Sequence, residues 1–128
     1  MSQTYTSGVD DFDTYIGLNP THSGNLGVRW FSNDETGQVT FDLGEELNTT
    51  RLAFWNGFSS SRVTSFEVYS DNDGDFDNGG TTLLGSFNPV ALTGDPVSVE
   101  VFDFTDAITQ FIHFNITDTG APGSATIK

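Results

Sequence analysis

Three runs of residues between positions 38 and 70 constrain the fold of this chain most strongly. The segments 38–44 and 65–70 alternate apolar with polar side chains, which is the pattern of strands with one buried face. The segment 51–56 between them is apolar on both faces, which predicts a central strand covered on both sides. Because loops and not helices separate these runs, they predict an all-β antiparallel sandwich or barrel.

The second half of the chain adds further strands. The segments 82–87, 97–101 and 110–117 have strand patterns, and 125–128 begins another strand. A bulge or a strand end is expected near 102–104, where the parity of the apolar residues changes, and a single turn at 105–109. In the run 110–117, the inward residues are Ile112, Phe114 and Ile116, and the outward ones are Phe111, His113 and Asn115. Residues 1–36 predict short strands around 15–18 and 28–31, joined by long loops. The prediction is about eight strands and no helix.

The length of 128 residues predicts a single domain that spans the whole chain, 1–128, and buries a core without staples. The chain has no cysteine, which excludes a disulfide framework and a thiolate metal site. It has no membrane-spanning run, and the first residues lack a signal peptide. The protein is therefore expected to be either cytosolic or a mature secreted fragment with an added start residue.

Charge is the most pronounced feature of the composition. Eighteen acidic residues face four basic ones, which gives a formal net charge of −14. Nucleic acid and anionic membrane surfaces repel such a chain, so neither is expected as a partner. The charge suits divalent cations, or it is a solvated acidic surface without a specific role.

Most of the chain, from about 29 to 124, resembles the discoidin (coagulation factor 5/8 type C) family. The resemblance lies in the order and spacing of five segments, which are Gln38-Val39-Thr40-Phe41-Asp42-Leu43-Gly44, Leu52-Ala53-Phe54-Trp55-Asn56, Ser65-Phe66-Glu67-Val68-Tyr69-Ser70, Leu83-Leu84-Gly85-Ser86-Phe87, and Val101-Phe102-Asp103-Phe104 followed by the run 110–117. It implies an eight-stranded jelly-roll sandwich of the galactose-binding-domain type. It also implies a non-catalytic module that binds glycans, lipids or proteins through loops at one end.

Two segments depart from that family's pattern. The segment 19–30 lacks the family's compact Asp-Gly motif, so the carboxylate that often helps to hold a structural calcium is not evident. The chain also stops at Lys128, before the family's usual closing strand. If the final strand is short or absent, an edge is left unpaired, and self-association through that edge strand is expected.

The acidic segment 71–80 is a candidate calcium site. Four carboxylates alternate along it, at Asp71, Asp73, Asp75 and Asp77, and could supply most of the oxygen ligands that calcium needs. The spacing is not that of an EF-hand, and the alternative is an ordinary acidic turn. A second acidic cluster, Asp10, Asp11 and Asp13, is interpreted as a solvated loop because nothing in the sequence fixes its geometry.

Candidate carbohydrate-binding residues are aromatic or fork-shaped polar side chains on predicted loops. An aromatic ring can stack on a pyranose, while Arg, Asn and His can bond its hydroxyl groups. The candidates are His22, Trp30, Asn33, Asn56, Phe58 and Arg62. Alternatives stay open: Trp30 and Trp55 could be core residues, Phe58 could lie under its loop, and Arg62 could only offset neighbouring acids. His113 is interpreted as an ordinary surface histidine.

The sequence lacks the motifs of an enzyme. Neither histidine lies in a nucleophile motif, and no close acidic pair suits glycoside hydrolysis. Two matches to the N-glycosylation sequon, at Asn48 and Asn115, are weak signals. The sequence therefore predicts an extracellular or cell-surface module that binds a glycan or glycoprotein without catalysis. The alternatives are a self-assembling subunit of an extracellular filament or surface layer, and a hydrolase.

Overall fold

The protein is a β-sandwich with a short helix, α1, at its side. The computed structural model describes residues 11–22, 30–32, 36–56, 62–90, 97–120 and 125–127, with only the backbone described at 22, 30–32 and 125–127. The described elements are α1 (Phe12–Gly17), β1 (Thr21–His22), β2 (Trp30–Ser32), β3 (Gly37–Phe54), β4 (Val63–Asp71), the 3-10 helix η2 (Phe76–Asn78), β5 (Thr82–Phe87), β6 (Val97–Ser98), β7 (Glu100–Thr119) and β8 (Ala125–Ile127). The predicted all-β class is confirmed.

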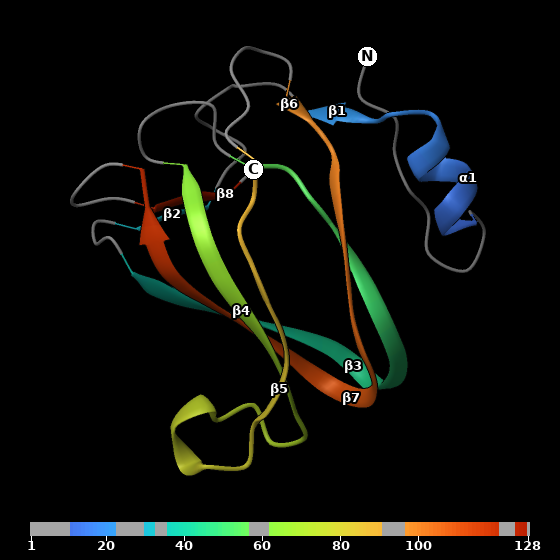
Figure 1. The fold of residues 1–128 in the computed structure, drawn as a ribbon. Helices are drawn as coiled ribbons and strands as arrows, with labels where there is room; N and C mark the ends of the chain where they lie inside the picture. Colours follow the sequence, from blue (N-terminus) through green and yellow to red (C-terminus); the bar gives the residue numbers. More distant parts are fainter. Residues whose placement is uncertain are drawn as a thin grey trace.

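Two long, bent strands supply both layers of the sandwich. β3 and β7 are antiparallel neighbours in the sheet β3-β7-β4-β5, and both fold back on themselves (Figure 1). The first half of β3 pairs with residues 111–116 and its second half with 100–109, with a register shift between Asp42 and Leu47. Gly44 lies in this bend at a φ of 82°, a conformation that favours glycine. Its amide donates to Asp42 Oδ1 over 2.8 Å, which stabilises the turn.

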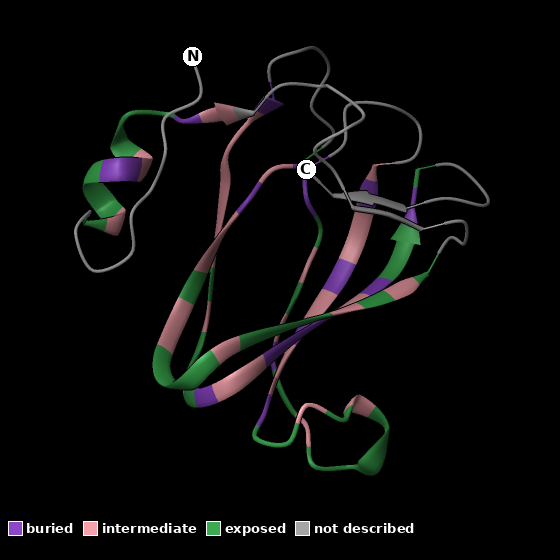
Figure 2. Cartoon of the chain, turned by 180° about the vertical axis from the view of Figure 1, so that it is seen from behind, coloured by how far each residue is buried: buried purple, intermediate pink, exposed green. Residues whose placement is uncertain are grey.

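Phenylalanine rings fill the space between the two layers. Phe66 of β4 is 1% exposed and lies 5.1 to 5.5 Å, between ring centroids, from four other phenylalanine rings. Those rings are Phe54, Phe87, Phe102 and Phe114, so both halves of the sandwich contribute to one cluster. Ile112, Phe114 and Ile116 are buried, as the alternating pattern predicts. Figure 2 shows this buried row along β7 and β4.

The arrangement of the strands differs from the prediction in three places. The runs 38–44 and 51–56 belong to one strand, β3, which lies at the edge of its sheet and not at its centre. The second half of β3 is apolar on both faces but only partly buried. Partial burial on both faces therefore accounts for an apolar run on an edge strand. The predicted turn at 105–109 is wrong, because β7 continues through it. The bulge predicted near 102–104 is confirmed. Thr49 of β3 pairs with Ala107 of β7 but Arg51 pairs with Asp103, so the register shifts between these two pairs.

The helix α1 is the other departure from the sequence prediction. Asp11 caps it by accepting from the Thr14 amide over 2.9 Å, and Tyr15 is buried on its inner face. Asp13 forms an ion pair with Arg51 of β3. The expectation that nothing fixes these acids is therefore wrong for Asp11 and Asp13, while Asp10 lies outside the described residues. The helical cap explains why the stretch around 15–18 is not a strand.

Two small sheets close one end of the sandwich. β1 pairs with β6, and β2 pairs with β8, both antiparallel. The strand that begins at Ala125 therefore exists, with Trp30 opposite Ile127. Within the described residues, no helix has the length and apolar character needed to cross a membrane.

Candidate functional site

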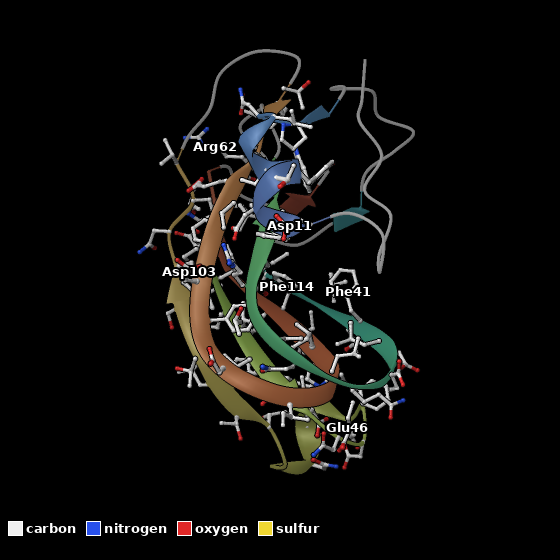
Figure 3. The ribbon with its side chains drawn as sticks, turned by 90° about the vertical axis from the view of Figure 1, so that its right-hand side faces the viewer. Asp11, Phe41, Glu46, Arg62, Asp103 and Phe114 are labelled. Carbon is white, nitrogen blue, oxygen red and sulfur yellow. The ribbon has the colours of Figure 1, made fainter. Side chains whose placement is uncertain are left out.

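The candidate carbohydrate-binding residues that the structure describes lie at one end of the sandwich. We call this the loop end; it comprises β1, β2, β6 and β8 together with Asn56, which follows β3, and Arg62, which precedes β4 (Figure 1). His22 is in β1 and Trp30 is in β2, so the fold brings both backbone positions to the same end as Arg62. Figure 3 shows Arg62 at this end and Glu46 at the opposite end.

Asn56 has a structural role at the loop end. It is 2% exposed, its Nδ2 donates to the Val63 carbonyl over 2.7 Å, and its Oδ1 accepts from the Val63 amide over 2.9 Å. An amide with both ends bonded in this way clamps the two strand ends on either side of residues 57–61. The side chain therefore positions a loop and does not reach a ligand itself.

Arg62 lies beside this clamp with part of its guanidinium unpaired. The residue is half-buried, and among the described residues its Nε is a buried donor without a hydrogen-bond partner. Its carbonyl accepts from the Gly120 amide over 3.0 Å, which fixes the backbone. Because Nε itself is closed to solvent, only the outer nitrogens of the guanidinium could bond a ligand oxygen. Asn33 and Phe58 lie outside the described residues, as do the side chains of His22 and Trp30.

Trp55 connects the loop end to the chain before β1. It is half-buried, and its Nε1 donates to the Pro20 carbonyl over 3.1 Å. The alternative that Trp55 is a core residue is therefore half correct, since the ring is packed but not enclosed.

The acidic loop, residues 72–81 between β4 and β5, lies at the opposite end of the sandwich (Figure 1). Its alternating acids form a ladder of local hydrogen bonds. Asp71 Oδ1 accepts from the Asp73 amide over 3.3 Å, Asp73 Oδ1 from the Asp75 amide over 2.9 Å, and Asp75 Oδ1 from the Asp77 amide over 3.0 Å. Each acid therefore caps the backbone two residues ahead, as Asx turns do. The spacing that predicts a calcium loop also fits this ladder.

His113 is fully buried, so the prediction of a surface histidine is wrong. The ring does lie on the outer face of its strand, as the alternation predicts, but it is 0% exposed. The acidic loop folds back over this face and places Phe76 against both Tyr69 and His113, at ring centroid distances of 5.1 and 5.4 Å. In the sequence, the signal that this loop packs onto the sheet is Phe76, an aromatic residue among acids.

A buried hydrogen-bond network connects three strands beneath the acidic loop. His113 Nε2 lies 3.1 Å from Asp71 Oδ2, and its Nδ1 lies 2.8 Å from the Thr40 hydroxyl. Burial raises the pKa of Asp71, while hydrogen bonds from His113 and from the Asp73 and Asn72 segment lower it, and the net pKa is lowered. Thr109 donates its hydroxyl to the Asp71 carbonyl over 2.7 Å. The order hydroxyl–imidazole–carboxylate is that of a hydrolytic triad, but an enclosed imidazole cannot exchange a proton with a substrate.

The acidic loop, as it is folded, does not fit a calcium ion. Asp71 is 5% exposed and turned towards His113, and Asp73 Oδ2 accepts from the Asn78 side chain. Within the described ranges, no three acidic or histidine side chains are grouped so that they could hold a metal ion. Calcium binding by Asp73, Asp75 and Asp77, which are exposed, therefore requires the loop to rearrange.

The calcium prediction can be tested by thermal unfolding. We expect millimolar calcium to raise the melting temperature, because a cation would offset the repulsion between the exposed carboxylates. The double variant Asp73→Ala plus Asp75→Ala should remove the increase, with magnesium as the control cation. A melting temperature that calcium leaves unchanged would show that the Asx ladder alone holds the loop.

The fold defines the class of this protein as a jelly-roll sandwich of the galactose-binding-domain type. No protein-family model matches the sequence, and no curated protein matches it. Comparison with solved structures does give matches. The CBM32 module of AlyQ, in complex with 4,5-unsaturated mannuronic acid, has a TM-score of 0.63 and 22% identity, covering 81% of this chain and 75% of that one.

The matching structures include modules from Clostridium perfringens. The family 32 module of NanJ, in complex with galactose, has a TM-score of 0.60 and 18% identity, covering 81% of this chain and 74% of that one. CBM32-3 from a family 31 glycoside hydrolase has a TM-score of 0.60 and 16% identity, covering 98% of this chain and 85% of that one. Such modules share their fold with discoidin-type domains, so the resemblance seen in the sequence is confirmed at the level of the fold.

Proposed function

We propose that this protein is a non-catalytic module that binds carbohydrate at the loop end. The observation that carries the proposal is the jelly-roll fold, which it shares with carbohydrate-binding modules solved in complex with sugars. A rigid sandwich that carries loops at one end is a common scaffold for recognition, because the loops can vary without changing the core. The enclosed position of His113, described above, supports the absence of catalysis.

The proposed binding residues are those whose side chains can stack on a sugar or bond its hydroxyl groups. Arg62 contributes its guanidinium, and Asn56 positions the loop 57–61 through its clamp on Val63. Phe58 lies within this loop and is proposed to stack on the pyranose ring. His22, Trp30 and Asn33 complete the proposed set. We place the protein at the cell surface or outside the cell, where such modules meet their glycans.

Binding at the loop end can be tested on a glycan array followed by calorimetry. We expect Phe58→Ala and Arg62→Ala each to weaken binding about tenfold or more, because each removes a side chain that contacts the sugar directly. Leu83→Ala is the matched control, since Leu83 is 50% exposed on β5 and lies away from the loop end. It should leave the affinity unchanged.

Two outcomes would contradict this proposal. Unchanged affinity in both loop-end variants would place the sugar elsewhere on the molecule. Large ordered assemblies in sedimentation, with no hit on the array, would favour the self-assembling subunit instead. The edge strand β3 gives that second function a surface, as it pairs only with β7 among the described strands.

A further inference from the structure

A groove separate from the loop end lies inside the bend of β3. Both halves of the strand contribute to it, and its cavity has a volume of about 290 Å³. The apolar lining comes from Phe41 and Leu43 in the first half, Leu52 in the second half, and Phe104 of β7. Figure 3 looks into this side of the sandwich, with Phe41 and Phe114 between the two arms of β3. An apolar cavity of nearly 300 Å³ with few polar groups is typical of a small-ligand site.

An aromatic ring stands at the mouth of the groove. Phe41 is 47% exposed, although its ring is held edge-on against the buried Phe114 at a centroid distance of 5.4 Å. The ring is therefore fixed in position before any ligand arrives, which reduces the entropy cost of binding. An exposed ring fixed in this way can stack on the apolar face of a pyranose.

The charge around the mouth is negative. Arg51 lines the groove, but its guanidinium forms an ion pair with Asp13 and lies 4.0 Å from Asp103. Its hydrogen bond to Asp13 and the negative charges of Asp13, Asp103 and Asp11 raise the pKa of Arg51. Three carboxylates therefore surround one cation, so the groove attracts a ligand with a positive charge and repels one with a negative charge.

We propose that this groove binds one unit of a cationic amino sugar, such as a glucosamine residue with a free amine. The pyranose would stack on Phe41, and its ammonium group would lie near Asp103. Uronic acids are repelled by the same carboxylates, and a second copy of this chain is disfavoured by its own net charge of −14. This inference takes from the proposed function only the class of ligand, carbohydrate. The site itself, the groove, is separate from the loop end.

Calorimetry with three oligosaccharides of equal length tests the proposal, using oligomers of glucosamine, N-acetylglucosamine and a uronic acid at mildly acidic pH. We expect the glucosamine oligomer to bind most tightly and to weaken as salt is added. Phe41→Ala should weaken its binding about two- to tenfold through the loss of stacking. Asp103→Asn should weaken it about two- to fivefold.

The Asp103→Asn variant also guards against misfolding, since the Asp103 side chain is 85% exposed and its loss cannot open the core. Asp77→Asn is the matched control, because it removes the same charge from the acidic loop and should leave binding unchanged. If sugars bind but neither groove variant changes the affinity for glucosamine, the groove proposal is wrong and the loop-end proposal stands. If no sugar binds at all, both are wrong. Tighter binding of a lysine-rich peptide than of the sugar, lost in Phe41→Ala, would also overturn the amino-sugar assignment.

Discussion

Phe66→Ala is expected to lower the free energy of unfolding by about 3–5 kcal/mol. The ring is 1% exposed and contacts phenylalanines from both layers of the sandwich, so its removal leaves a cavity that no single side chain can fill. A loss of this size is a large share of the stability of a domain, which is about 5–15 kcal/mol. The variant should therefore be at the limit of folding.

Urea unfolding followed by circular dichroism measures this effect. Phe41→Ala is the matched control, because it removes the same atoms from a ring that is 47% exposed and should cost much less. Phe66→Leu should fall between Phe66→Ala and the unchanged protein, since leucine fills part of the space. Equal losses for Phe66→Ala and Phe41→Ala would contradict the core described here.

Asp71→Ala is the second substitution for which we expect a large effect, of about 3 kcal/mol or more. The change leaves His113 Nε2 and the amides of Asn72 and Asp73 without their acceptor, and the first of these groups is fully buried. Asp77→Ala removes an exposed carboxylate from the same loop and should change stability by less than about 0.5 kcal/mol. Similar losses in both variants, measured by urea unfolding, would show that the buried network contributes little.

The buried pair of Asp71 and His113 also makes the stability of the protein depend on pH in acid. The pKa of Asp71 is lower in the folded state than the ordinary value of 3.8, so its contribution is complete above that value and is lost as the pH falls through the lower, folded-state pKa. Melting temperatures measured from neutral pH to about pH 2 should therefore fall more steeply in the unchanged protein than in Asp71→Asn, which has no charge to lose. A parallel fall in both proteins would contradict this assignment.

The fold class follows from the sequence because local alternation is a strong signal. Ile112, Phe114 and Ile116 face the core as their spacing predicts, and the phenylalanines form the interior. The long strands were harder to predict. Gly44 and the polar residues after it indicate a turn between two strands, yet β3 stays paired with β7 on both sides of its bend. Whether β3 stays paired through its bend depends on β7, which is distant in sequence. The local pattern around Gly44 carries no information about that partner.

The burial of His113 shows a second limit of local patterns. Alternation places the ring on the outer face, and only the return of a distant loop covers it. The pairing of His113 with Asp71 joins residues far apart in sequence, and the acids of this loop suggest a metal before they suggest a cap. Phe76 is the residue that indicates packing, because an aromatic side chain in a solvated acidic loop would be exposed to water without gain.

The candidate sites, too, were predicted from the sequence only in part. The loop end gathers Arg62 with the strands of His22 and Trp30, as the family resemblance implies. The burial of Asn56 was not predicted. Its partner is the backbone of Val63, and since every residue carries these backbone groups, the sequence does not indicate the pairing. The groove was missed as well, because its lining comes from two halves of one strand that were predicted to be separate.

The bend of β3 and β7 also has a consequence for how the molecule assembles. Since the same two chain segments run through both layers, neither layer can form and persist while the other is unfolded. Their pairing joins residues near position 37 to residues near 116, so a large part of the chain must be synthesised and brought together before this ladder can close. Folding of this kind is slow and all-or-none, and a substitution that disturbs the bend around Gly44 affects both layers at once.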